Sequence, residues 1–148
     1  MARKKIEITL KDGENEWHFE IVKMSAVKLE SWIIRAALAL TSSGIKVPVG
    51  ADLKKVGASL IKENIINFIG NLEYDKAMPL LNEMLECCSR VLGNAREKCT
   101  LDSVSNYIED IETLFELRKE AVKLNLGFLR EKLDKNSDSQ EDPSSTEQ

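Results

Sequence analysis

The chain has 148 residues, of which 43% are hydrophobic and 31% charged, and its formal net charge is −4 at pH 7. This length suits one domain with a sizeable core, and the composition is that of an ordinary soluble globular protein. No apolar run reaches the roughly 18–20 residues that a membrane span needs, and no apolar segment follows the basic N-terminus, so neither a membrane anchor nor secretion is expected.

The negative charge lies at the C-terminal end. Residues 134–148 hold five acids and one base, so the preceding residues are formally neutral, with 20 bases and 20 acids. Those residues have no long basic run of the kind that phosphate binding favours, which argues against nucleic acid as a partner. Because the acidic segment lacks large apolar side chains, we predict a disordered tail at 134–148 and a single mostly helical domain at 1–133.

Two segments near the N-terminus alternate between apolar and polar side chains, which is the period of a half-buried strand. They cover about residues 5–11 and 16–22, and Asp12-Gly13 between them is a turn signal. We therefore predict an antiparallel hairpin over about residues 5–22, with its apolar face against helices.

The next segment, Met24–Leu40, predicts a helix that is apolar almost all the way round, with Ser25 as its N-cap. A helix with so little polar surface must be wrapped by other elements, so we expect it to be central and mostly buried. Two apolar stripes at helical spacing support this: Leu29, Ile33, Ala36, Ala37 and Leu40 form the first, and Val27, Ile34 and Leu38 form the second.

Three more segments have helical periodicity, at about residues 53–71, 76–92 and 102–133. Gly93-Asn94 would end the second of these helices, and 94–101 would be a loop. The third carries a break signal near Ser105. The predicted fold is therefore mainly α, an N-terminal β-hairpin followed by a bundle of four helices, the first central and mostly buried.

The sequence holds none of the arrangements that usually carry catalysis. A Gly-rich phosphate loop, a Gly-x-Ser-x-Gly elbow, His-Glu-x-x-His and Cys-x-x-Cys are all missing from it. The chain has one histidine, and two of its three cysteines, Cys87 and Cys88, are adjacent, which makes a poor zinc site. We interpret the cysteines as small apolar helix residues in a reducing cytoplasm, and we expect neither an enzyme nor a cofactor.

An acidic cluster, Glu109, Asp110 and Glu112, could imitate the metal ligands of a small hydrolase. On a helix, however, Glu109 and Glu112 share a side while Asp110 points elsewhere. A solvated helix face is the interpretation that we prefer.

Two arginines are bordered by apolar residues, Arg35 in the first predicted helix and Arg118 in the last. A guanidinium in such surroundings usually needs a carboxylate partner. We predict that Arg35 or Arg118 pairs with Glu30, Glu109 or Glu112 and pins the last helix onto the first. The alternative is that these arginines anchor a partner protein.

Three segments, taken in order, carry a resemblance to a known family. They are Met24-Ser25-Ala26-x-x-x-Glu30-x-Trp32-x-x-Arg35-Ala36-x-x-Ala39-Leu40, Pro79-Leu80-Leu81-Asn82-Glu83-Met84-Leu85-Glu86-Cys87-Cys88 and Ile108-Glu109-Asp110-x-x-Thr113-x-x-x-Leu117-Arg118-Lys119-Glu120-Ala121-x-x-Leu124-Asn125-x-x-Phe128. Together they resemble the tail assembly chaperones of long-tailed phages and prophages. In that family a histidine or an aromatic residue is expected near positions 124–126, where this chain has Asn125 and Leu126.

The resemblance implies a non-enzymatic function in phage tail morphogenesis. Such proteins bind the long tape-measure protein, keep it soluble, recruit tail-tube subunits and are absent from the mature virion. We therefore expect a protein of the bacterial host cytoplasm whose partners are the tape-measure and tail-tube proteins, with self-association as a further option and no nucleic acid or membrane. Candidates for partner binding or for structural ion pairs are Arg35, Glu109, Glu112, Arg118, Asn125 and Phe128.

The alternative is a small helical regulatory module that binds DNA, with the hairpin as a wing. It would need a basic recognition helix, and none of the predicted helices is clearly basic.

Overall fold

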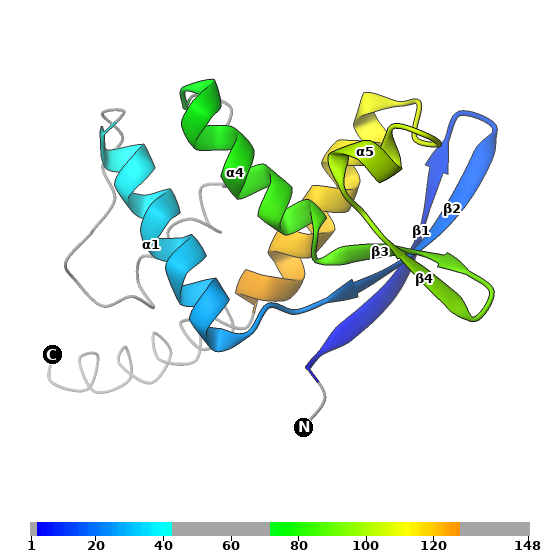
Figure 1. Cartoon of the computed structure of the whole chain (residues 1–148), viewed down its shortest axis with the longest axis horizontal. Coiled ribbons are helices and arrows are strands. Elements are labelled where there is room, and N and C mark those ends of the chain that lie inside the picture. The colour runs from blue at the N-terminus through cyan, green and yellow to red at the C-terminus, as the bar shows by residue number, and fades with distance from the viewer. Residues whose placement is uncertain (1–2, 43–71, 128–148) are drawn as a thin grey trace, which may run out of the picture.

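The computed structural model describes residues 3–42 and 72–127 (Figure 1). The predicted helix at 53–71, the predicted tail at 134–148 and Phe128 lie outside these ranges. Within them, no helix is both long and apolar enough to cross a membrane.

The elements are β1 (Lys5–Asp12), β2 (Asn15–Val22), α1 (Ala26–Ser42), α4 (Tyr74–Leu85), β3 (Cys88–Leu92), β4 (Ala95–Lys98), α5 (Leu101–Val104) and a helix at residues 111–127, here called the C-terminal helix.

The strands form one antiparallel sheet in the order β1-β2-β3-β4. The predicted first hairpin is confirmed, since β1 and β2 pair from Lys5 opposite Val22 to Asp12 opposite Asn15. Its apolar side chains lie on one face: Phe19 and Ile21 are fully buried, and the alternate residues of β1 pack against the same core. Period-two alternation was therefore a sufficient signal for this hairpin.

The prediction of a four-helix bundle after one hairpin is wrong, because a second hairpin occupies residues 88–98. The predicted helix at 76–92 ends as α4 at Leu85, and Cys88 begins β3; the predicted loop at 94–101 contains β4. The sequence of β3 does not show the apolar–polar alternation of a strand, because Arg90, which lies opposite Phe19, occupies the face that packs on the core. There its guanidinium lies 3.8 Å from the centre of the Tyr107 ring and 3.1 Å from Glu97, which compensates the charge.

Gly93 lies in the turn of this second hairpin and has a φ of 62°, a left-handed conformation that disfavours other residues. A Cβ at this position would meet no atom within 4 Å, so only the backbone opposes a side chain. We expect Gly93→Ala to lower the free energy of unfolding by about 1 kcal/mol in urea titrations. As a control, Gly127→Ala lies in a helix with equally open space and should be neutral or stabilising by about 0.5–1 kcal/mol. Equal effects of the two substitutions would contradict the role of the turn.

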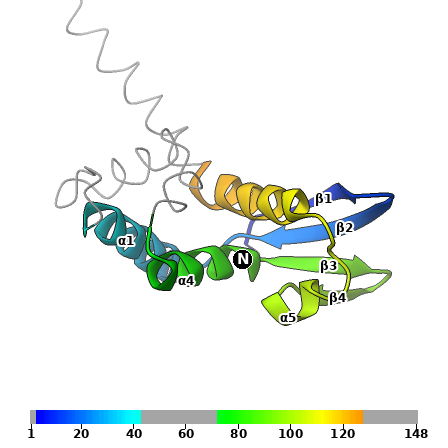
Figure 2. The same ribbon diagram turned by 90° about the horizontal axis from the view of Figure 1, so that it is seen from above.

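The C-terminal helix, not α1, connects the parts of the described structure. The predicted break near Ser105 is confirmed, since α5 ends at Val104 and the C-terminal helix begins at residue 111. At its start, Thr113 Oγ1 donates to the Lys11 carbonyl at 3.0 Å; near its end, Asn125 Oδ1 accepts from the Met24 backbone N–H at 2.8 Å. The helix therefore runs along the first hairpin from its turn to its open end (Figure 2). Its buried residues include Leu117, Ala121, Leu124 and Leu126.

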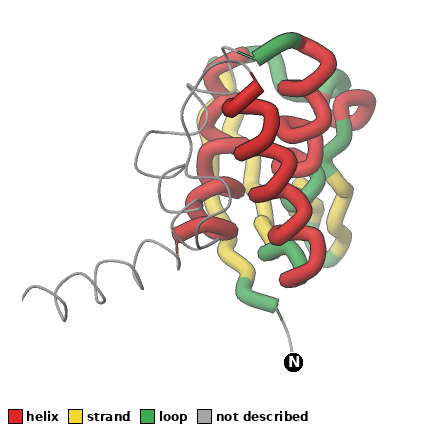
Figure 3. Tube along the Cα trace, turned by 90° about the vertical axis from the view of Figure 1, so that its left-hand side faces the viewer, coloured by secondary structure: helices red, strands yellow, loops and turns green. Residues whose placement is uncertain are grey.

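The expectation of a central, wrapped α1 is also wrong. Its first stripe is buried together with Trp32, whose indole N–H donates to the Leu80 carbonyl of α4 at 3.0 Å. Its second stripe is exposed, so the helix is amphipathic with an apolar outer face. Figure 1 places α1 at the end of the molecule farthest from the sheet, and Figure 3, viewed from that end, shows helices in front of the strands.

Candidate functional site

Exposed apolar side chains follow one line along α1. Val27, Ile34 and Leu38 are 78%, 39% and 53% exposed, and their spacing of seven and four places them on one side of the helix. We call these three residues the α1 stripe. Single exposed apolar residues are ordinary, but Ile34 and Leu38 lie one turn apart, and neighbouring exposed apolar side chains on a helix are typical of a contact surface.

The α1 stripe continues into a groove between α1 and α4 with a volume of about 560 Å³. Leu38 and Ala39 of α1 face Pro79 and Leu80 of α4 across it, and Arg35, Ser42, Asp75 and Lys76 complete the lining. We call this the α1–α4 groove. Lys76 Nζ donates to Ser42 Oγ at 3.1 Å, which links the two helices at that end.

Arg35 of α1 and Glu83 of α4 join the same two helices through a bidentate ion pair, with N–O distances of 2.5 and 2.6 Å. The hydrogen bond to Glu83 raises the pKa of Arg35 above its usual value. The predicted pairing of Arg35 with Glu30, Glu109 or Glu112 is wrong. The pair instead holds α1 against α4, because Arg35 lies on the side of α1 that faces α4.

We expect this pair to contribute little to stability, because its side chains are 42% and 34% exposed. A double-mutant cycle of Arg35→Ala and Glu83→Ala, measured by thermal or urea unfolding, should give a coupling energy of about 0.5–1 kcal/mol. A coupling well above about 2 kcal/mol would show that water screens the pair less than its exposure implies.

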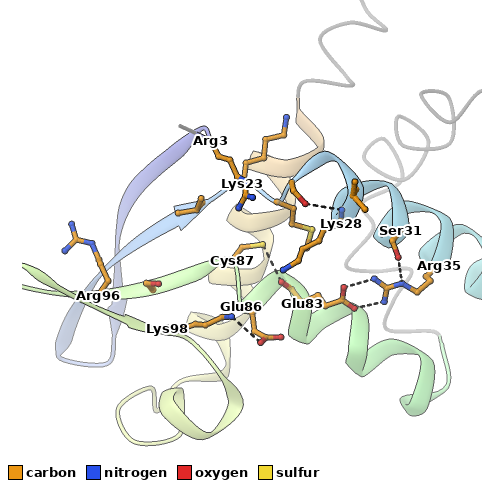
Figure 4. Close-up of a pocket in the computed structure, with 15 residues that line it drawn as sticks. Arg3, Lys23, Lys28, Ser31, Arg35, Glu83, Glu86, Cys87, Arg96 and Lys98 are labelled. Carbon is orange, nitrogen blue, oxygen red and sulfur yellow. Dashed lines mark hydrogen bonds and ion pairs between the residues drawn. The ribbon is translucent and has the colours of Figure 1, made fainter. Parts of the chain in front are cut away.

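A second cavity, of about 660 Å³, lies where the open end of the sheet meets the beginning of α1 and the end of α4. Six basic residues and only two acids contribute to its walls, so we call it the basic pocket (Figure 4). Other lining residues include Met24, Ser25 and Cys87. The charged lining residues are Arg3, Lys23, Lys28, Arg35, Arg96, Lys98, Glu83 and Glu86.

Several of these cations already have carboxylate partners. Lys98 Nζ lies 3.7 Å from Glu86, and Arg96 lies 3.4 Å from both Glu7 and Glu20. The sequence did not predict this pocket, because its basic residues are separated by up to 95 positions and no segment among them is basic by itself. Only the pairing of β2 with β3 brings Arg96 and Lys98 close to the start of α1.

Arg118 and Asn125 are core residues in this structure. Arg118 is 6% exposed, its Nε has no hydrogen-bond partner among the described residues, and burial lowers the pKa of its guanidinium. Asn125 is fully buried: Oδ1 accepts from Met24, Nδ2 donates to the Ala121 carbonyl at 2.8 Å, and the sulfurs of Met84 and Cys87 lie beyond. Neither side chain is presented on the surface, and their part in partner binding stays a prediction.

Glu109 and Glu112 are exposed at the start of the C-terminal helix, and Figure 1 shows this start on the side of the molecule away from α1, the helix that carries Arg35. The described residues include no group of three His, Cys, Asp or Glu side chains that could hold a metal ion. All three cysteines are free thiols, and burial raises the pKa of each.

Asp12 is the residue that sequence reasoning missed at this end of the helix. Its side chain reaches from the end of β1 to the start of the C-terminal helix and is 2% exposed. Its carboxylate accepts from the backbone N–H groups of Glu109 and Asp110 at 2.8–3.1 Å, from Thr113 Oγ1 at 3.0 Å and from Trp17 Nε1 at 3.1 Å. In return Asp110 Oδ2 accepts from the Gly13 N–H at 2.8 Å. Asp12 therefore caps this helix from another part of the chain.

Comparisons of this chain with protein-family models, with curated proteins and with solved structures find no match.

Proposed function

We propose that this chain is a phage or prophage tail assembly chaperone that binds the tape-measure protein, keeps it soluble and helps to recruit tail-tube subunits. The supporting observation is the α1 stripe together with the α1–α4 groove, because they present apolar surface at a helix pair. The three segments that resemble the family contribute α1, α4 and the C-terminal helix. The proposed place of action is the cytoplasm of the bacterial host, before the virion is complete.

The physical fit between partner and surface supports the proposal. A tape-measure protein is expected to be a long helical chain with apolar seams, which would aggregate if left uncovered. An apolar groove between two helices is a common receptor for an amphipathic helix, whose i, i+3, i+4 and i+7 side chains enter it. On this proposal Leu38, Ala39 and Pro79 contact the seam, the buried Leu80 lies beneath them, and the polar residues of the groove surround it.

Co-expression with the tape-measure protein encoded beside it tests the proposal. We expect the soluble fraction of that protein to increase several-fold with this chain and the two proteins to co-purify. An unrelated small acidic protein at the same expression level is the control for general effects on solubility. Unchanged tape-measure solubility with and without this chain would contradict the assignment.

A DNA-binding regulatory module remains the second candidate, and the basic pocket is the observation that favours it. We prefer the chaperone, because Glu83 and Glu86 share the lining of that pocket and would repel a phosphate backbone. A gel shift at 50 mM salt with mixed-sequence duplexes tests this candidate. Retardation that weakens steeply with salt would support the module, and no retardation would remove it.

A further inference from the structure

We propose that the basic pocket binds the acidic segment of this same chain, residues 134–148. This inference does not depend on the proposed function. It follows from three observations: the net positive charge of the pocket lining, the ion pairs that its cations do and do not form, and the contact of the C-terminal helix with residues at the edge of the pocket.

The two parts have opposite charges of equal size. The pocket lining has four more bases than acids, and residues 134–148 have four more acids than bases. The remaining residues of the chain also have four more acids than bases, so the basic lining of the pocket stands out against an otherwise acidic chain. Opposite potentials of this kind favour contact and set its orientation.

Some cations of the pocket already bind carboxylates, and two others form no ion pair with a described residue. Glu83 occupies Arg35 in bidentate geometry and Glu86 lies beside Lys98. The side chains of Arg3 and Lys28 form no ion pair with any described residue, although both line the same cavity. Aspartate and glutamate side chains therefore match the chemistry of the site better than a bulky phosphate chain does.

The C-terminal helix brings the acidic segment close to the pocket. Asn125 bonds to the Met24 backbone, and Met24 and Ser25 line the pocket. From Gly127, the last described residue, seven residues lead to Asp134, and they can span up to about 24 Å. A short tether of this kind gives an effective concentration of the order of millimolar, so individually weak ion pairs can suffice.

Nuclear magnetic resonance of the full chain tests the proposal. The pocket variant is Arg3→Glu with Lys28→Glu, and the matched control is Lys11→Glu with Lys119→Glu, two exposed lysines outside the pocket. We expect the backbone amide shifts of residues 134–148 to move in the pocket variant and to stay in the control. The same shifts should move in the unmodified chain at 1 M salt, where the Debye length falls to about 3 Å from about 8 Å at 0.15 M.

A reciprocal variant keeps the pocket intact and neutralises the segment, by Asp134→Asn, Asp138→Asn, Glu141→Gln, Asp142→Asn and Glu147→Gln. We then expect the amide signals of Ser25 and Lys28 to shift. The indole signal of Trp32, which is buried and bonded to Leu80, reports that each variant is folded.

Three outcomes would overturn the proposal. Amide shifts of residues 134–148 that ignore both the pocket variant and salt would show that the segment does not enter the pocket. Shifts that change on dilution would assign the pocket to the acidic segment of a second copy. Saturable shifts of the pocket amides by a short DNA duplex, with no response to the tail substitutions, would assign it to nucleic acid.

Discussion

Replacing Asp12 by alanine is expected to lower the free energy of unfolding by about 3 kcal/mol, a large effect for one side chain. The substitution removes a helix cap and leaves two backbone N–H groups and the Trp17 indole without their shared acceptor, whereas the Thr113 hydroxyl keeps the Lys11 carbonyl. Urea unfolding followed by circular dichroism measures the change.

Glu14→Gln is the matched control, because it removes a carboxylate from the exposed turn of the same hairpin. It should change the free energy of unfolding by less than about 0.5 kcal/mol. If Asp12→Ala is as mild as Glu14→Gln, the connection between hairpin and helix is not what holds the C-terminal helix in place.

The same carboxylate makes stability depend on acid pH. Burial by itself raises the pKa of Asp12, but the hydrogen bonds from Asp110, Glu109, Trp17 and Thr113 outweigh it, so the folded pKa lies below the ordinary 3.8. A lowered folded pKa means that the stabilisation is complete above about pH 3.8 and is lost as the pH falls through the folded value. Asp12→Asn should remove this part of the pH dependence, which urea titrations between pH 2 and 6 would show.

Asn125→Ala is expected to cost about 3 kcal/mol of unfolding free energy. The side chain is fully buried, and its loss leaves a hole beside Met84 and removes the acceptor of the Met24 N–H. Asn106→Ala, at an exposed position, is the control and should be nearly neutral. Differential scanning calorimetry of both variants measures the difference.

This prediction also separates two interpretations of Asn125. If its role is to fix the start of α1 against the C-terminal helix, stability falls. A variant with unchanged stability that no longer binds the tape-measure protein would instead identify Asn125 as a partner contact.

The parts of the fold that sequence predicted are those that local patterns determine. The first hairpin has strict alternation and an Asp-Gly signal, α1 has a cap at Ser25, whose hydroxyl accepts from the Lys28 N–H at 3.3 Å, and the break near Ser105 precedes a turn. In each case the deciding residues are neighbours in the chain.

The second hairpin was missed because its pattern is ambiguous when read locally. Cys88, Val91 and Leu92 are spaced like a helix stripe, whereas Gly93-Asn94 also suits a two-residue hairpin turn. What selects the strand is pairing with β2, where Ile21 lies opposite Cys88, a contact across 67 positions. Tertiary pairing therefore overrides the helical pattern of residues 86–92.

The candidate sites depend even more on contacts between distant segments. An aspartate in a turn gives no sign that it will cap a helix nearly 100 residues later, as Asp12 does. Apolarity all round α1 predicted burial on both sides, because sequence cannot distinguish a core face from a face that is left for a partner. The candidate Arg35 was correct as an ion-pair residue, but its partner, Glu83, depended on how α1 packs on α4.

Binding of the tape-measure protein by two matched variants tests the proposed function most directly. Ile34→Glu with Leu38→Glu charges the α1 stripe, and Ile111→Glu with Phe115→Glu makes the same change at exposed residues of the C-terminal helix, which are 65% and 49% exposed. All four residues are accessible, so both variants should fold, which circular dichroism checks. Affinity purification of each variant after co-expression gives the retained tape-measure protein. We predict at least a tenfold loss for the α1 variant and near-complete retention for the C-terminal variant; equal retention by both would contradict a binding surface on α1.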